Sequence, residues 1–137
     1  MNKNLIIVED SGEVRKLLRI TLGYGLYRIH EVDNAAEALV LARSVRPDVM
    51  LLDVMLSGGV SGFQLCEQVK RDPLLRSAFV VMVTARGSEA DIAEGQRCGA
   101  DAHVVKPFSP AHLIQVIESR EQSGSQALAP TGMPGTG

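Results

Sequence analysis

Residues 47–56 read PDVMLLDVML, and this stretch decides the fold class. Four consecutive apolar residues, 49–52, lead directly into Asp53. A short, unbroken apolar run of this kind is typical of a strand that is buried on both faces of a parallel sheet. Open parallel sheets gather their functional residues at the carboxyl ends of the strands. The stretch therefore predicts a central strand with an acid at its functional end.

Four further runs of similar character lie on either side of this strand, and amphipathic segments separate them. The runs occupy 5–8, 28–32, 79–83 and 102–105. The run at 28–32 is the most mixed of the four. In the intervening segments apolar residues recur at helical spacing, as at Val14, Leu18 and Leu22. Five β-α units in succession predict a parallel α/β sheet with helices on both faces.

Polar residues mark the expected starts of three helices. Asn34 precedes Glu37 by three residues, which is the spacing of a capping box, and Ser88 precedes Asp91 in the same way. Ser109 is followed by a proline, a residue that suits the first position of a helix. These signals place helix starts between the predicted strands, as the β-α alternation requires.

The bulk composition suits one soluble domain. The chain has 137 residues, 45% of them hydrophobic and 22% charged, which is enough apolar material for a single core. The net charge of -2 gives no sign of a basic surface for nucleic acid or for an anionic membrane. No apolar run approaches the roughly 20 residues of a membrane span. The first ten residues lack the long apolar stretch of a signal peptide, so we expect a cytoplasmic protein.

The two cysteines, Cys66 and Cys98, lie far apart in the sequence and lack CxxC spacing. This pattern argues against a disulfide framework or a zinc site, and it fits a reducing compartment. Both cysteines fall in helix-like stretches. We therefore expect them to act as small hydrophobic residues of the core.

The composition changes after Glu121. The remaining sequence, QSGSQALAPTGMPGTG, is rich in glycine, proline, serine and threonine and contains no aromatic residue. Such a segment cannot bury enough apolar surface to offset the entropy of ordering itself. We expect one domain over residues 1–121 and a disordered tail over residues 122–137.

Polar residues follow four of the five predicted strands at one edge of the sheet. Glu9 and Asp10 follow the first strand, Asp53 ends the third, Thr84 ends the fourth, and Lys106 follows the fifth. Clustered carboxylates repel one another and need a cation, and oxygen ligands select a hard ion such as Mg2+. A lysine and a hydroxyl can contact phosphoryl oxygens. A carboxylate can attack phosphorus to give an aspartyl phosphate, a transfer that needs mainly positioning and charge neutralisation.

Each of these features has an ordinary explanation when it is taken alone. Glu9 and Asp10 would favour the start of a following helix through its dipole. Asp53 would serve as a turn residue, as would the lysine–proline pair after the fifth strand. Thr84 would be an ordinary strand former or helix-entry residue. The functional interpretation prevails because all four features occur together, each at the end of its own strand.

Four motifs, in order and at suitable separations, carry a resemblance to a known family. They are LIIVED at 5–10, PDVMLLDVML at 47–56, VVMVTA at 80–85 and GADAHVVKPF at 99–108. With these motifs the chain resembles the receiver domains of two-component response regulators over roughly residues 3–120. The resemblance implies a doubly wound sheet of five parallel strands with the flavodoxin-like strand order 2-1-3-4-5.

The resemblance also implies roles for the residues at the strand ends. Asp53 would accept a phosphoryl group from a sensor histidine kinase or a histidine phosphotransfer protein. Thr84 and Lys106 would contact that group, and the Lys106–Pro107 peptide bond would be cis. Mg2+ would be held, directly or through water, by the carboxylates of Glu9, Asp10 and Asp53 and by the backbone carbonyl of Met55.

Two features depart from the usual receiver pattern. The loop at 54–62 reads VMLSGGVSG, whereas receivers usually have proline at the position of Ser57 and one residue fewer before the glycine matched by Gly62. Gly58 and Gly59 permit positive φ angles in this longer loop. His103 occupies the position where receivers usually carry the tyrosine or phenylalanine of a rotating switch. We expect either an altered, pH-sensitive switch formed by Thr84 and His103, or a surface histidine without such a role.

The implied function is a phosphorylation-controlled signalling switch, and not an enzyme beyond catalysing its own phosphorylation and dephosphorylation. A downstream protein target would bind the surface from Glu89 to Gln122. We expect no direct contact with nucleic acid and no membrane partner. The chain is either a stand-alone receiver or a part of a longer protein.

Three other functions compete with this one. A flavin carrier of the same fold would need a phosphate-binding loop after the first strand, but EDSGE at 9–13 would repel a phosphate. A haloacid-type phosphatase would need a second acid two residues after its nucleophile, and DVM at 53–55 lacks it. A receiver-like module that binds partners without phosphorylation remains the alternative, and the intact acids with Thr84 and Lys106 argue against it.

Overall fold

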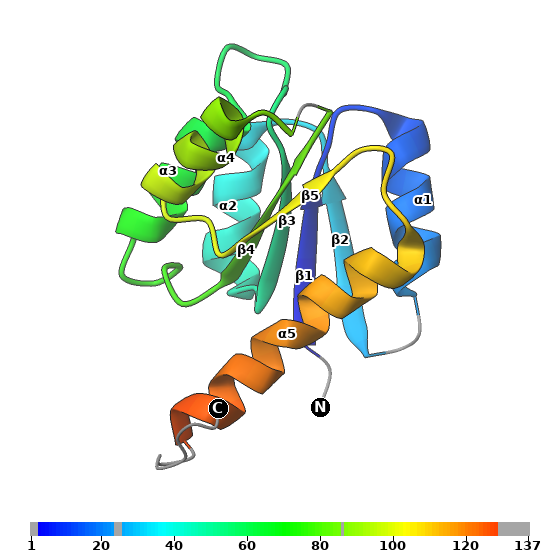
Figure 1. Ribbon diagram of the computed structural model, residues 1–137. Coiled ribbons are helices and arrows are strands. Elements are labelled where there is room, and N and C mark those ends of the chain that lie inside the picture. Colours follow the sequence, from blue (N-terminus) through cyan, green and yellow to red (C-terminus); the bar gives the residue numbers. More distant parts are fainter. Residues whose placement is uncertain (1–2, 24–25, 86, 129–137) are drawn as a thin grey trace.

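Strands and helices alternate along the part of the chain that the computed structural model describes, residues 3–23, 26–85 and 87–128, with side chains described up to residue 120 (Figure 1). The elements, in chain order, are β1 (Lys3–Val8), α1 (Gly12–Leu22), β2 (Tyr27–Val32), α2 (Ala35–Val45), β3 (Val49–Asp53), α3 (Gly62–Arg71), β4 (Phe79–Thr84), α4 (Glu89–Arg97), β5 (Ala102–Val105) and α5 (Pro110–Leu128). The predicted β-α alternation is confirmed.

The five strands form one parallel sheet in the order β2-β1-β3-β4-β5. This is the predicted doubly wound, flavodoxin-like order. From β1 the chain first adds β2 on one side of the sheet and then β3, β4 and β5 on the other side, so the switch point lies between β1 and β3. Ligand sites in such sheets lie at that switch point, beyond the carboxyl ends of the strands. None of the helices in the described part of the chain has the length and apolar character needed to cross a bilayer.

Alternate residues of the strands face two separate layers of core. On one face, Ile6, Met50 and Met82 pack with residues of α2 and α3. On the other face, neighbouring strand residues such as Leu51 and Val83 pack with residues of α1 and α5. Figure 1 shows the two groups of helices on opposite sides of the sheet. The strands have continuous apolar sequences because both of their faces are buried, as predicted.

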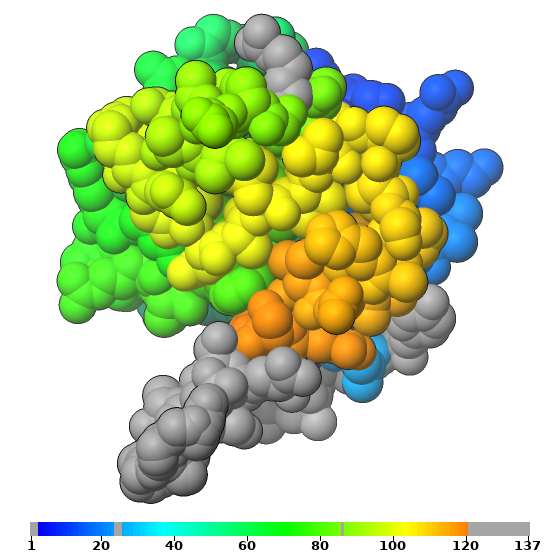
Figure 2. Space-filling view, viewed as in Figure 1, coloured from blue at the N-terminus to red at the C-terminus, as the bar shows by residue number. Residues whose placement is uncertain are grey.

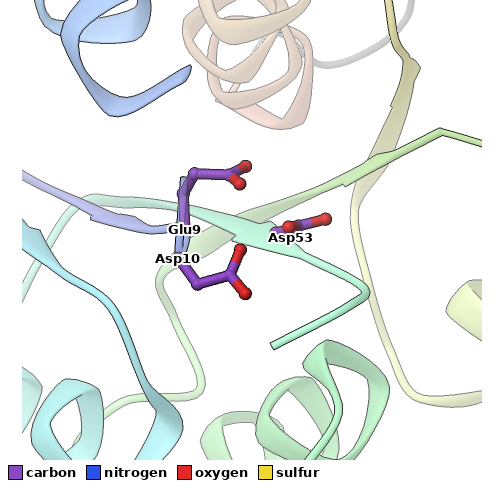
Figure 3. Close-up of side chains that lie close together, drawn as sticks. All are labelled: Glu9, Asp10 and Asp53. Atoms are coloured by element: carbon purple, nitrogen blue, oxygen red, sulfur yellow. The ribbon is translucent and has the colours of Figure 1, made fainter. Parts of the chain in front are cut away.

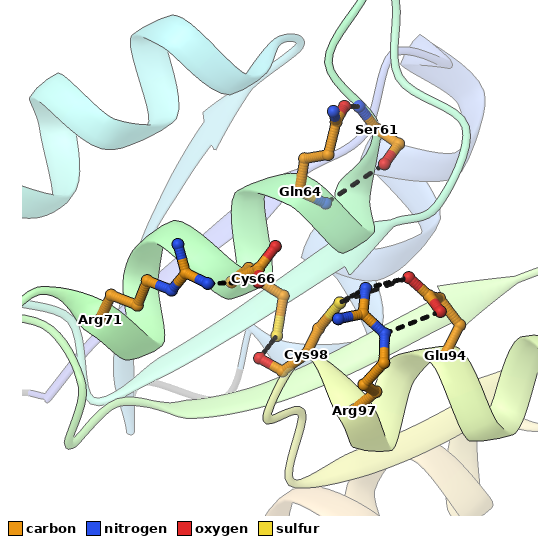
Figure 4. Close-up of polar contacts among 8 residues, drawn as sticks. Ser61, Gln64, Cys66, Arg71, Glu94, Arg97 and Cys98 are labelled. Atoms are coloured by element: carbon orange, nitrogen blue, oxygen red, sulfur yellow. Dashed lines mark hydrogen bonds and ion pairs between the residues drawn. The ribbon is translucent and has the colours of Figure 1, made fainter.

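The predicted helix starts are occupied by capping side chains. Asn34 accepts a hydrogen bond from the amide of Glu37, and Ser88 accepts one from the amide of Asp91. Ser109 accepts one from the third residue of its helix in the same way. A complete capping box, with both of its hydrogen bonds, lies at the start of α3 between Ser61 and Gln64 (Figure 4). Capping therefore fixes where the helices begin relative to the strand ends.

Both cysteines are free, buried core residues, as predicted. The thiol of Cys66 on α3 donates to the carbonyl oxygen of Cys98 at the end of α4, with an S–O distance of 3.5 Å (Figure 4). Burial raises the pKa of Cys66 to about 12. A thiol that stays protonated at neutral pH packs as a small hydrophobic group and is a poor nucleophile.

The end of the chain differs in part from the compositional expectation. Helix α5 continues past residue 121 to Leu128, so the predicted domain boundary falls inside a helix. Glutamine and alanine in this stretch have high intrinsic helix propensity, and this local preference does not depend on how much apolar surface the segment can bury. Residues 129–137 of the predicted tail lie outside the described residues. The division into domain and tail stays a prediction.

Candidate functional site

Three carboxylates lie together at the carboxyl ends of β1 and β3 (Figure 3). One carboxylate oxygen from each of Glu9, Asp10 and Asp53 lies within 4.8 Å of the other two. Glu9 is only 2% exposed and Asp53 only 6%, whereas Asp10 is exposed to solvent. The cluster therefore has a buried floor and one open side through which an ion or a phosphoryl donor can enter.

Strand pairing explains why these acids meet. Val8 of β1 lies beside Leu52 of β3, so the next residue of each strand, Glu9 and Asp53, reaches the same edge of the sheet. The amide of Glu9 donates to the carbonyl of Val32 at 3.1 Å, which holds the end of β1 against β2. The segment that follows β1 folds back toward the Glu9 side chain, because the amide of Ser11 donates to Glu9 Oε2 at 3.3 Å.

Lys106 brings a positive charge into the cluster from the far side of the sheet. Its Nζ lies 3.0 Å from Glu9 Oε1 and 3.5 Å from Asp53 Oδ1. Its amide donates to the carbonyl of Thr84 at 2.7 Å, which ties the residue to the end of β4. The Lys106–Pro107 bond is cis, the conformation that the resemblance implied. One ammonium group thus contacts two of the three carboxylates.

Burial and the charge of Asp53 act together on the pKa of Glu9, and Lys106 opposes them. Removal of water raises its pKa, and the nearby carboxylate of Asp53 raises it further. The hydrogen bond from Lys106 lowers the pKa, but the net direction is upward. A buried carboxylate with this balance gains from any added cation, because a second positive charge offsets both the burial and the repulsion.

The remaining predicted residues of the site lie at neighbouring positions. Thr84 ends β4 and is buried, with 3% exposure. The amide of Met55 donates to Asp53 Oδ1 at 3.3 Å, so the backbone that follows the strand folds back toward the acid. The Met55 side chain itself is 69% exposed. The structure brings these residues to the same edge as the acids, while their roles toward a metal or a phosphoryl group stay predictions.

His103 lies apart from the acids, on β5 beneath α4. Its ring packs so closely on α4 that a Cβ atom added at Gly95 would lie 3.2 Å from its Cε1 atom. Its Nε2 atom is buried and has no hydrogen-bond partner among the described residues. Burial lowers the pKa of His103, and the charge of Asp91 only partly opposes this effect. The ring is thus partly buried between two elements, while both a switching role and the alternative of a histidine without such a role stay predictions.

A small cavity adjoins this histidine. It has a volume of about 170 Å³ and is lined by Ile92, Gln96, Ala100, Asp101, Ala102 and His103. The ring of His103 therefore borders free space that residues of α4 also line.

Two residues shape the site without having been assigned a role from the sequence. Arg15, in the first turns of α1, donates from Nη1 to the backbone carbonyl of Glu9 at 2.7 Å. Gly62 starts α3 so close to β3 that an added Cβ would clash with the carbonyl oxygen of Asp53. The sequence matched Gly62 only by its place in the resemblance. Arg15 lies on a helix with other basic residues, and its sequence context does not separate it from them.

The arrangement has the chemical parts of a site for a hard cation and a phosphoryl group. Three carboxylates supply only oxygen ligands, which suit Mg2+. The ammonium group of Lys106 lies close enough to Asp53 to contact a group attached to that carboxylate. The open side at Asp10 gives access from solvent.

Comparison with known proteins agrees with this fold. A model of the response regulator receiver domain matches residues 5–118, and the chain belongs to this family. It is 35% identical over 119 residues to the phosphate regulon transcriptional regulatory protein PhoB of Pseudomonas aeruginosa, covering 87% of this chain and 52% of that protein. It is 32% identical over 122 residues to the transcriptional regulatory protein ResD of Bacillus subtilis, covering 89% and 49%.

A solved structure gives the same result at the level of the fold. The chemotaxis protein CheY4 of Vibrio cholerae superposes with a TM-score of 0.81 at 27% identity, covering 87% of this chain and 98% of that one. The chain spans about half the length of the curated relatives it matches. It is therefore a receiver domain of the two-component response regulator class, which is a family of signalling domains.

Proposed function

We propose that this receiver domain takes a phosphoryl group onto Asp53 and that the modification switches its binding to a partner protein. One observation carries the proposal. The Asp53 carboxylate lies in a cluster of three acids whose oxygens approach within 4.8 Å, and Lys106 Nζ lies 3.5 Å from it. Acidic oxygens and a lysine in this arrangement suit phosphoryl transfer better than they suit a structural ion pair.

A divalent cation fits the site, and Mg2+ is the proposed cofactor. Glu9, Asp10 and Asp53 would hold it directly or through water, with the backbone carbonyl of Met55 as a further ligand. When bound, it would neutralise charge on the carboxylates and on the phosphoryl oxygens. The raised pKa of Glu9 supports this proposal, because burial and repulsion leave that carboxylate short of positive charge.

The residues of this chain have separate tasks in the proposed transfer. An oxygen of Asp53 forms a bond to phosphorus while the phosphorus–nitrogen bond of a phosphohistidine donor breaks, and the released imidazole takes up a proton. Lys106 offers its ammonium group to a phosphoryl oxygen, and Thr84 offers its hydroxyl to another. The donor is a sensor histidine kinase or a histidine phosphotransfer protein.

The proposed response reaches the surface through β4, β5 and α4. Thr84 would move toward the phosphoryl group, and His103 on the neighbouring strand would change its position. The surface from Glu89 to Gln122, which we propose binds the downstream target, includes α4, β5 and α5. Figure 2 shows its yellow-green to orange part as one continuous face. We place the protein in the cytoplasm, where the two free cysteines would stay reduced.

The proposal is tested with a small acyl phosphate and Mg2+, followed by intact-mass spectrometry. The wild-type protein should gain one labile phosphoryl group, and Asp53→Asn should gain none. Asp33→Asn is the matched control, because Asp33 lies at the same edge of the sheet after β2 but outside the acid cluster. Labelling of Asp53→Asn at the wild-type level would overturn the assignment. A wild-type protein that binds its partner equally with and without the phosphoryl group would favour the phosphorylation-independent alternative.

A second experiment separates the metal from the phosphoryl group. Calorimetric titration of the unphosphorylated protein should show Mg2+ binding that weakens in Asp10→Asn. Lys106→Ala should still be labelled but should show a smaller conformational change in NMR spectra, because the lysine detects the new charge. Unchanged Mg2+ affinity in Asp10→Asn would remove Asp10 from the proposed ligand set.

A further inference from the structure

Arg15 connects the acid cluster to the edge strand β2. Within the described residues it does so through the Glu9 backbone and the Glu31 side chain, and not through a carboxylate of the cluster. Its Nη1 donates to the backbone carbonyl of Glu9 at 2.7 Å, and its Nε lies 3.5 Å from Glu31 Oε1 on β2. The side chains of both Arg15 and Glu31 are 24% exposed. The guanidinium group is therefore partly shielded from water and is held in two directions at once.

These contacts complete the fixation of the Glu9 backbone. The amide of Glu9 already donates to the carbonyl of Val32, and Arg15 occupies its carbonyl. With both polar groups of the residue engaged, the peptide that joins Glu9 to Asp10 has one preferred orientation. That orientation decides where the first two carboxylates of the site point relative to Asp53 on β3.

Charge alone does not account for the placement of Arg15. Glu31 also accepts from Arg19 at 2.8 Å, so one carboxylate of β2 holds two guanidinium groups of α1. Arg15 and Arg19 carry the same charge, share the same partner and lie one helical turn apart. Of these two arginines, only Arg15 donates to the Glu9 carbonyl within the described part of the chain. The two arginines thus differ in this directed hydrogen bond and in exposure, since the side chain of Arg15 is 24% exposed and that of Arg19 is 51% exposed.

We infer that Arg15 is a positioning residue for the metal site, and that Glu31 holds Arg15 in place. This inference rests on the proposed binding of Mg2+ by the acid cluster. The planar guanidinium can donate toward Glu9 and Glu31 together because its N–H groups are fixed in a fork. Residues that orient the ligands of a metal typically contribute ten- to hundredfold in affinity.

The test compares Arg15→Met with Arg19→Met in Mg2+ titrations followed by calorimetry and by the amide NMR signals of residues 9–11. Methionine keeps an unbranched apolar stem and removes the donors, so loss of packing is limited. Arg15→Met should weaken Mg2+ binding about tenfold, whereas Arg19→Met should leave it within about twofold. Arg15→Lys should give an intermediate loss, because lysine keeps the charge but not the fork.

The possible outcomes separate this inference from the proposed function. Wild-type protein that takes up no Mg2+ would overturn the metal site and the inference together. Wild-type binding with equal affinities in Arg15→Met and Arg19→Met would overturn the inference alone. Thermal unfolding without Mg2+ controls for a folding defect: if Arg15→Met unfolds cooperatively and still binds tenfold more weakly, the effect belongs to the site. If Arg15→Met does not fold, a wild-type affinity in folded Arg15→Lys would overturn the inference, and a reduced affinity would support it.

Discussion

At the scale of single residues, Glu9 shows how the site balances burial against charge. It is 2% exposed, and its pKa is raised mainly by burial and further by Asp53. Within the described residues, the cation in contact with its carboxylate is Lys106, whose Nζ lies 3.0 Å from Glu9 Oε1. Breaking a buried ion pair by removing one partner leaves an uncompensated charge, which is more costly than never having had the pair.

Lys106→Ala should therefore lower the free energy of unfolding in Mg2+-free buffer, by about 2 kcal/mol given that the lysine is partly exposed. The double variant Glu9→Gln/Lys106→Ala should recover part of that loss, because the carboxylate left without a partner is gone. Urea denaturation of the wild type, both single variants and the double variant measures the coupling. Additive effects of the two substitutions would mean that the 3.0 Å contact contributes nothing to stability.

The sequence predicts the acids and the lysine but not the arginine, for a physical reason. An acid that ends an apolar run is placed by strand geometry, because parallel strands finish at one edge. Glu9, Asp53 and Lys106 belong to this class. Arg15 acts through a hydrogen bond to a backbone carbonyl. The sequence does not show which long side chain on that face of α1 makes this bond. Only the folded structure distinguishes Arg15 from Arg19.

At the scale of elements, the connection from β3 to α3 carries the departure from the usual receiver pattern. Leu56 and Val60 pack against the core, while Gly58 and Gly59 between them adopt φ angles of 90° and 83°. Ser57 forms an isolated parallel bridge with Asn34 at the start of α2. The longer loop is thus anchored at both ends and against a neighbouring loop. The sequence predicted the glycines' conformation but not the bridge, which joins segments distant in the chain.

The end of this loop gives a sharp test of how tightly α3 must approach β3. Gly62→Ala should destabilise the domain by roughly 1–3 kcal/mol, because a Cβ atom there would clash with the Asp53 carbonyl oxygen and the backbone must move. The same displacement should weaken Mg2+ binding, since Asp53 is a proposed ligand. Gly12→Ala is the matched control, because its Cβ meets only Arg15 Nη2 at 3.6 Å. Equal stability of the two variants in urea denaturation would show that the connection adapts freely.

At the scale of the whole molecule, His103 lies where helix α4 packs against strand β5. Asp91 of α4 is the charged group that raises its pKa, while the carboxylate of Asp101 in the adjoining cavity is already engaged by Lys70 and by the amide of Val80. On β4 the register partner of His103 is Met82, which is uncharged. Burial therefore dominates, and the neutral form of the ring is favoured.

This balance sets the direction of a pH effect on folding. The pKa of His103 is lower in the folded state than the unfolded value of about 6.5, so the unfolded chain binds more protons in the interval between them. The stability that the neutral ring contributes is present above about pH 6.5 and is lost as the pH falls through the folded-state pKa. His30, whose pKa burial also lowers, adds a slope of the same sign. His103→Tyr should flatten the pH dependence of the free energy of unfolding, as measured by urea denaturation at several pH values.

The same neutral-ring preference should appear in signalling. If His103 turns further inward when Thr84 moves toward a phosphoryl group, protonation opposes that movement because a charged imidazole is costly to bury. The response to a phosphoryl mimic, followed by NMR shifts in α4 and β5 or by partner affinity, should then be weaker near pH 6 than near pH 8. In His103→Tyr the response should be stronger and independent of pH over this range, since tyrosine does not titrate there. Equal responses of the wild type and His103→Tyr at both pH values would exclude a switching role for position 103. The alternative of a histidine without such a role would then hold.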